Sequence, residues 1–193
     1  MQDGVQPNRA KFLLIVGLFA LPIIASYLTY FVWPPQGGAR NYGVLIPPEP
    51  IPDTLTLTTL ETGLPTALKA LRGQWLLVQV DAANCAEACE QKLYAMRQVR
   101  LMQGREQDRV ARIWLVEDGK LPSALLQQKY SGTLMLADPS RALLAKLAAH
   151  GDPKQGIFMI DPHGNLMMRW PADVDMKRMH KDIDRLLKAS QIG

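Results

Sequence analysis

One long stretch of this chain, from Phe12 to Trp33, contains no charged side chain. At about 1.5 Å per residue, a helix over this stretch reaches roughly 33 Å, and the hydrocarbon core of a bilayer is about 30 Å thick. Pro22 is compatible with such a helix, because membrane helices accept proline more readily than soluble helices do. The stretch therefore predicts a transmembrane anchor over residues 12–33.

The charges beside this stretch predict its orientation. Arg9 and Lys11 precede it, whereas only Arg40 follows soon after it. Because basic residues favour the cytoplasmic side, we expect residues 1–11 inside and the rest of the chain in the periplasm of a bacterium, attached to the inner membrane by one span. A cleaved signal peptide is the alternative. The apolar region of a signal peptide is usually about 7–15 residues long, and this stretch is longer. No small-x-small cleavage site ends it either, so we favour a retained anchor.

The next segment, residues 34–53, is expected to be a linker. Six prolines and three glycines lie between Pro34 and Pro52, with no helical or alternating pattern. Such a composition is typical of an extended spacer between membrane and domain, or of disordered chain. Residues 42–46 include apolar side chains that could pack on the domain.

Residues 54–193 are predicted to form one folded domain. The whole chain is 48% hydrophobic and 21% charged, which is enough to bury a core, and its net charge of +4 is too small to indicate a nucleic-acid partner.

Within this domain, strands are expected within 54–60, 74–80, 109–118, 133–139 and 156–170, the last as a hairpin. Helices are expected after residue 84 and over 122–129, 140–150 and 174–190. The 54–60 segment alternates as an edge strand would. This β-α-β order followed by a hairpin and a helix predicts an α/β fold with a mixed sheet.

The chain has two cysteines, Cys85 and Cys89, at the start of the helix that follows the second strand. With 100° per residue, both sulfurs lie on the helix face that points into the domain. Residues four apart on a helix are neighbours, so the pair could close a disulfide or share a metal ion. Asn84 is the expected N-cap, which would place Cys85 in the first helical turn, where a thiolate is favoured. Structural bridge, redox pair and metal ligands all remain open at this point.

A metal would usually require a third donor besides two thiolates, and the chain offers three histidines. Thiolates favour Cu(I) among the available metals. His163 lies in the hairpin turn, distant from the cysteines, and His180 lies mid-helix. His150 precedes the loop that enters the hairpin and is the histidine that can approach Cys85 and Cys89.

Several features together resemble the Sco proteins: a single anchor, a proline-rich spacer, LRGQWLLVQV, a C-x-x-x-C at a helix start and a late FMIDPHGNL hairpin. Sco proteins are membrane-anchored, thioredoxin-fold factors that help to build the copper centre of cytochrome c oxidase. The resemblance implies a thioredoxin-like fold, with Cys85 and Cys89 as a copper-binding or thiol–disulfide pair. The family's prolines after each cysteine are replaced here by Ala86 and Glu90, and Pro153 stands where the family has its third copper ligand, a histidine.

Three functions follow as hypotheses. The leading one is a divergent Sco-like assembly factor for cytochrome c oxidase, with an oxidase subunit as client. It would act on copper delivery or on the thiol redox state of the client through Cys85 and Cys89, with His150 as an optional third copper ligand. The second is a thiol–disulfide oxidoreductase, which would make the protein an enzyme. The third is a membrane-tethered, non-catalytic interaction protein of the same fold.

Overall fold

The computed structural model describes residues 9–32, 41–190 and 192, which divide into two units, one on each side of the boundary between Arg40 and Asn41. Of the predicted segments, residues 1–8 and 33–40 lie outside the described residues. They include Trp33 and the first part of the predicted linker.

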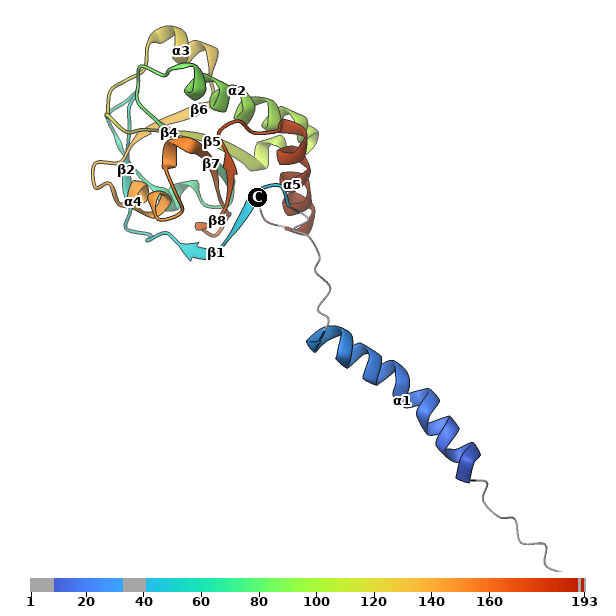
Figure 1. Ribbon diagram of the computed structural model, residues 1–193. Coiled ribbons are helices and arrows are strands. Elements are labelled where there is room, and N and C mark those ends of the chain that lie inside the picture. The colour runs from blue at the N-terminus through green and yellow to red at the C-terminus, as the bar shows by residue number, and fades with distance from the viewer. Residues whose placement is uncertain (1–8, 33–40, 191, 193) are drawn as a thin grey trace, which may run out of the picture. The chain divides into compact units, whose positions relative to one another are not determined.

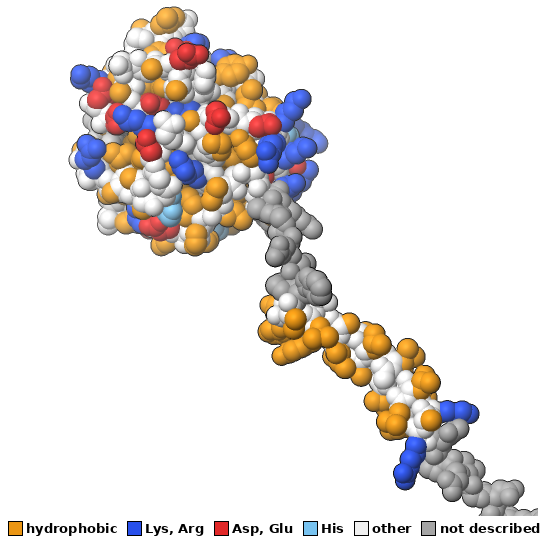
Figure 2. Space-filling view, viewed as in Figure 1, with side chains coloured by type: hydrophobic (Ala, Val, Ile, Leu, Met, Phe, Trp, Pro, Cys, Tyr) orange, Lys and Arg blue, Asp and Glu red, His pale blue; other side chains and the backbone are white. Residues whose placement is uncertain are grey.

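The first unit contains one α-helix, α1, over Arg9–Phe31. It is long and apolar enough to cross a membrane, and none of its residues is buried against the protein. Figure 2 shows hydrophobic side chains along the helix, with basic side chains at its N-terminal end. These properties fit a single-pass membrane anchor.

The second unit is an eight-stranded mixed sheet with helices on both faces, as the sequence predicted (Figure 1). Its strands are β1 (Val44–Pro50), β2 (Thr56–Thr59), β3 (Pro65–Ala67), β4 (Trp75–Asp81), β5 (Val110–Val116), β6 (Thr133–Ala137), β7 (Gly156–Ile160) and β8 (Asn165–Pro171). Its α-helices are α2 (Glu87–Met102), α3 (Ala124–Lys129), α4 (Ala142–Ala148) and α5 (Met176–Ala189), and its short 3₁₀ helices are η1 (Leu68–Leu71), η2 (Gly104–Arg109) and η3 (Pro153–Gln155).

The strands follow the order β1-β8-β7-β4-β5-β6-β2-β3. β4, β5 and β6 run parallel, whereas the remaining pairs are antiparallel. β4 and β5 lie in the middle and are almost entirely buried, which explains their nearly continuous apolar sequence. The parallel strands β4 and β5 therefore end at the same edge of the sheet, where the chain turns into α2 and toward α3.

Two apolar clusters cover the two faces of the sheet. On one face, α2 and α5 contribute Met96, Val99, Met179 and Ile183, which pack with Leu77 of β4. On the other face, Leu143 and Leu147 of α4 pack with Val78 and Val80 of β4 and with Ile113 of β5. The side chains of β4 alternate between the two faces, as the pleat of a strand requires.

Part of the predicted linker belongs to the sheet. Val44–Pro50 form β1, which pairs with β8 at one edge, with a register shift between Leu45 and Glu49. Three residues of β1 are prolines, which have no backbone N–H to donate. They are tolerated because, in an edge strand, such positions can face outward instead of toward the neighbouring strand. The folded unit therefore begins before residue 54, and the expected 34–53 linker is wrong in its second half.

A second difference concerns the strand expected at the edge. β2 lies between β6 and β3, so the edge is formed by the three-residue strand β3. Alternation in Thr56–Thr59 correctly indicated a strand with one buried face, but an alternating strand can lie inside an antiparallel part of a sheet as well as at its edge.

Candidate redox site

Cys85 and Cys89 form a disulfide, with their Cα atoms 5.2 Å apart. Cys89 lies in the first turn of α2, while Cys85 lies in the loop that joins β4 to this helix. Both sulfur-bearing residues are buried, with 8% of Cys85 and 2% of Cys89 exposed. The expectation that both sulfurs point into the domain is therefore confirmed, and Cys85 is the more accessible of the two.

The expected helix start was wrong. Asn84 does not cap α2; the N-cap is Ala86, without a side-chain hydrogen bond. The N–H of Cys85 donates to the carbonyl oxygen of Ala82 at 3.2 Å, which closes a turn ahead of the helix. Cys89, not Cys85, consequently occupies the first helical turn, where the aligned backbone N–H groups favour a thiolate.

The disulfide lies against an apolar wall between α2, β5, β6 and α3. Its buried members besides the cysteines are Leu93, Trp114, Val116, Tyr130 and Met135. Such surroundings disfavour a charged thiolate, which opposes the effect of the helix terminus on Cys89. The amide nitrogen of Gln79 lies 3.8 Å from the sulfur of Cys89 and is the polar contact to this sulfur among the described residues.

Gln79 is itself fully buried in the centre of β4. Its amide oxygen has no hydrogen-bond partner among the described residues. Because the amide nitrogen faces the sulfur, Gln79 can donate a hydrogen bond to the Cys89 thiolate once the disulfide is reduced.

Lys92 places a buried cation on the same face of α2 as Cys89. Its ammonium lies 2.6 Å from a carboxylate oxygen of Asp81 and donates to the backbone carbonyls of Val80 at 3.2 Å and Lys154 at 2.6 Å. Burial lowers the pKa of Lys92 and raises the pKa of Asp81, and in each case the partner's charge opposes the shift. This ion pair ties the end of β4, the first turns of α2 and η3 together.

Glu90, directly after Cys89, interacts with two residues at the end of α3, Lys129 and Tyr130. Its carboxylate pairs with Lys129 and lies 3.3 Å from the Tyr130 hydroxyl, which donates toward it. Lys129 holds the pKa of Glu90 below its usual value. Glu90 is therefore an anion with a cationic partner on α3.

His150 contacts an acid on β1. Its Nε2 lies 3.0 Å from Glu49, whose other carboxylate oxygen lies 2.5 Å from the ammonium of Lys146. His163 lies in the hairpin turn, and His180 is hydrogen-bonded to Gln103 at 3.1 Å. Within residues 9–32 and 41–190, no three His, Cys, Asp or Glu side chains are grouped in a way that could hold a metal ion. The described residues therefore bring Cys85 and Cys89 together but do not supply a three-donor copper site.

The ion pair between Lys92 and Asp81 was not predicted from the sequence, although the pattern of the residues contained an indication of it. At 100° per residue, Lys92 falls on the same buried helix face as Cys89, where an unpaired charge would be costly. Asp81 ends the buried strand from which this helix departs. The combination indicates an ion pair, but the two carbonyl acceptors of Lys92 come from the fold.

The domain and its cysteine pair define a thioredoxin-like protein, and the apolar helix of the first unit fits a membrane anchor. A family model described as "Transmembrane-like, thioredoxin-like, C-terminal domain" matches residues 75–190, more than half of the chain, and the chain belongs to this family. A search of curated proteins finds no match.

Solved structures with the same fold include Sco proteins. A SCO1/SenC family lipoprotein from Bacillus anthracis has a TM-score of 0.58 and 19% identity, over 75% of this chain and 96% of the other. Yeast Sco1 with copper bound has a TM-score of 0.57 and 15% identity, over 75% and 96%. The thioredoxin domain of a thiol–disulfide oxidoreductase from Bacteroides vulgatus has a TM-score of 0.51 and 14% identity, over 76% and 97%. The predicted thioredoxin-like fold is thus confirmed, and the resemblance to Sco proteins is confirmed at the level of the fold.

Proposed function

We propose that this protein is a membrane-anchored, Sco-like assembly factor for cytochrome c oxidase that changes the thiol redox state of a client through Cys85 and Cys89. The observation that carries the proposal is the joined cysteine pair at the start of α2, in a thioredoxin-like domain. The proposed location is the periplasm, supported by the basic residues that precede the apolar helix and by the disulfide, which persists in oxidising compartments.

The chemical step is a two-electron exchange. The Cys85 thiolate of the reduced protein attacks a disulfide of the client, forming a Cys85–client bond and releasing one client thiolate, which takes up a proton. The Cys89 thiolate then attacks the Cys85 sulfur. This forms the Cys85–Cys89 disulfide and releases the second client thiolate, which is protonated in turn. A separate dithiol reductant returns the pair to the reduced state.

Cys85 is assigned the first attack because it is more exposed than Cys89. Cys89 is better placed to resolve the mixed disulfide, since it is four residues away on the first helical turn and contacts Gln79. The buried Lys92–Asp81 pair holds the helix start and the end of β4 in place during the exchange.

The exchange is tested with the reduced full-length protein in nanodiscs and a peptide that contains an intramolecular disulfide. We expect the wild type to reduce the peptide, Cys85→Ser to be inactive, and Cys89→Ser to accumulate a mixed disulfide visible by mass spectrometry. Equal thiol release from the wild type and both variants would contradict the assigned roles.

The reduction potential distinguishes a working pair from a structural bridge. Working oxidoreductases lie between about −120 and −270 mV, whereas structural disulfides typically lie below about −300 mV. We expect a value in the first range from equilibration with glutathione or a stronger dithiol buffer. A value below about −300 mV, together with full rescue of oxidase assembly by a Cys85→Ala/Cys89→Ala variant in a deletion strain, would favour the non-catalytic interaction protein.

Copper delivery is the second candidate, and the copper bound to the yeast Sco1 structure is the observation that favours it. Here copper would be cargo, held by the two thiolates of the reduced pair. We expect the reduced protein to bind Cu(I) with a stoichiometry that falls in Cys85→Ser and in Cys89→Ser. Because His150 contacts Glu49, His150→Ala should leave the Cu(I) affinity unchanged. A marked loss of affinity in His150→Ala would instead identify this histidine as a third ligand.

A further inference from the structure

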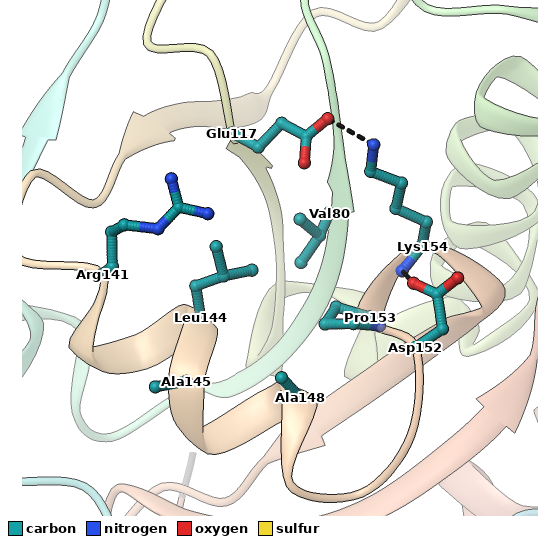
Figure 3. A pocket seen from close by; sticks show the side chains of 9 residues that line it. All are labelled: Val80, Glu117, Arg141, Leu144, Ala145, Ala148, Asp152, Pro153 and Lys154. Carbon is teal, nitrogen blue, oxygen red and sulfur yellow. Dashed lines mark hydrogen bonds and ion pairs between the residues drawn. The ribbon is translucent and has the colours of Figure 1, made fainter.

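A hollow lies at the edge of the sheet where the parallel strands end, on the face covered by α4. Its volume is about 380 Å³, and its lining residues are Val80, Glu117, Arg141, Leu144, Ala145, Ala148, Asp152, Pro153 and Lys154 (Figure 3). Small-molecule sites of α/β proteins lie outside the carboxyl ends of strands and have volumes from about 300 Å³ upward. Both the position and the size of this hollow therefore fit a small ligand.

The inner surface of the hollow is apolar. Val80 comes from β4, Leu144 and Ala148 from α4, and Pro153 from η3. Figure 3 shows the side chain of Leu144 between that of Arg141 and those of Val80 and Pro153. These side chains provide an apolar surface without a hydrogen-bonding group, which suits a hydrocarbon body.

The charges on the rim are not equivalent. The ammonium of Lys154 pairs with Glu117 at 2.5 Å, and Asp152 accepts the backbone N–H of Lys154 at 2.9 Å. Arg141 is exposed, and its guanidinium has no hydrogen bond or ion pair to any of the residues that the structure describes. Arg141 and Asp152 thus carry the two rim charges without an ion-pair partner among the described residues, and the guanidinium of Arg141 is the group whose hydrogen-bond donors are unused.

The backbone holds Arg141 in this position. Its φ of 55° and ψ of 15° are left-handed, and Arg141 is the one non-glycine residue with positive φ in the described part of the chain. Residues other than glycine adopt this conformation at a cost, and such outliers concentrate at functional sites. Figure 3 shows Arg141 and Asp152 on opposite sides of the hollow, so an anion at Arg141 is separated from that carboxylate.

From these observations we infer that the hollow binds a small organic monocarboxylate with an aliphatic body. The carboxylate accepts hydrogen bonds from the guanidinium of Arg141, and the hydrocarbon lies along Leu144, Ala148 and Pro153. Binding at this site does not require the cysteine chemistry proposed above, because the hollow lies on the opposite face of the sheet from α2.

The test uses the full-length protein in nanodiscs of zwitterionic lipid, with labelled Ala, Leu and Val methyl groups observed by NMR. Hexanoate is the probe, 1-hexanol and hexylamine are the uncharged and cationic analogues, and empty nanodiscs correct for partitioning into lipid. We expect saturable shifts at Val80, Leu144 and Ala148 with hexanoate, and at least about tenfold weaker binding of both analogues, since a hydrogen bond to a charged group contributes a factor of this size or more.

Three variants locate the site. Arg141→Gly removes the guanidinium while accepting the left-handed backbone, and it should weaken hexanoate binding at least about tenfold. Ala148→Leu fills the hollow and should abolish binding. Arg105→Gln, which removes an arginine on η2, is the matched control and should bind as the wild type does.

The inference would be overturned by equal binding of hexanol and hexanoate, by wild-type affinity in Arg141→Gly, or by shifts confined to other methyl groups. Saturable binding of an acidic, apolar peptide at these methyl groups without binding of hexanoate would also overturn it, and would assign the hollow to a protein segment.

Discussion

At the scale of single residues, the buried Lys92 links α2 to the end of β4 and to η3. Its ammonium is held by Asp81 and by two backbone carbonyls, those of Val80 and Lys154. Removing one partner of a buried pair leaves an uncompensated charge, whereas replacing both partners can be nearly neutral. The stability of the double variant, compared with that of each single variant, therefore separates the effect of the ion pair from the effect of either residue.

We expect Asp81→Asn to reduce the free energy of unfolding by about 3 kcal/mol or more, because the Lys92 ammonium keeps its charge but loses its carboxylate. Lys92→Met should cost less, since Asp81 is 19% exposed at its side chain and can be hydrated. The double variant should be more stable than Asp81→Asn alone. Chemical unfolding of the full-length protein, followed by tryptophan fluorescence, measures these differences.

Lys129→Met is the matched control, because Lys129 forms a more exposed pair with Glu90. Its expected effect is about 1 kcal/mol or less. If Asp81→Asn were no more damaging than this control, the Lys92–Asp81 pair would have no special structural role.

At the scale of elements, β1 is attached to α4 by one acidic residue. Glu49 of β1 contacts Lys146 of α4 and His150 just beyond it, through separate carboxylate oxygens. Hydrogen bonding from Lys146, and then from His150, lowers the pKa of Glu49 below its ordinary value of 4.5. The attachment of this edge strand is therefore expected to depend on pH.

Because the folded-state pKa of Glu49 is lowered, the ionised carboxylate stabilises the fold above pH 4.5, and this contribution is lost as the pH falls through the lowered value. Glu49→Gln should therefore destabilise the domain near neutral pH, and the difference from the wild type should shrink progressively as the pH falls below 4.5. The measurement is the difference in unfolding free energy between wild type and variant across this range. Glu61→Gln, at an exposed turn, is the control; a Glu49→Gln effect independent of pH would contradict the assignment.

At the scale of the whole molecule, Asp182 of α5 fixes the point where the chain enters the folded unit. Its carboxylate accepts the backbone N–H groups of Tyr42 at 2.9 Å and Gly43 at 2.8 Å, and the indole N–H of Trp170 at 3.1 Å. Gly43 has no room for a side chain, because an added Cβ would lie 2.6 Å from the Trp170 indole nitrogen. The N-terminal end of the folded unit is thus attached to β8 and α5.

Asp182→Asn should destabilise the domain by about 2–3 kcal/mol, because an amide presents a donor where the carboxylate accepts charge-assisted hydrogen bonds. Hydrogen exchange should increase at Tyr42 and Gly43 more than at the centre of β4. Asp184→Asn, two residues further on the exposed side of α5, is the matched control, with an expected effect within about 0.5 kcal/mol. Equal effects of the two variants would show that Asp182 does not hold this segment.

The sequence by itself determined the features that depend on local periodicity and composition. The uncharged stretch predicted α1, and the local pattern predicted the strand within 74–80, which is β4, and the hairpin within 156–170, which is β7 and β8. The 100° spacing placed Cys89 on the inward face of α2, whereas Cys85, also buried, lies in the loop before the helix. Each of these follows from the geometry of a few consecutive residues, so no knowledge of distant partners was required.

Only the tertiary structure decided the features that depend on long-range contacts. β8 draws Val44–Pro50 out of the predicted linker into the sheet, and the pairing of β2 with β6 moves the edge to β3. Glu49 of β1 contacts His150, and backbone carbonyls at the end of β4 and in η3 accept hydrogen bonds from Lys92. The physical reason is the same in each case: hydrogen-bonding and charged groups are satisfied by partners far away in the chain, and spacing along the sequence does not specify which of them will meet.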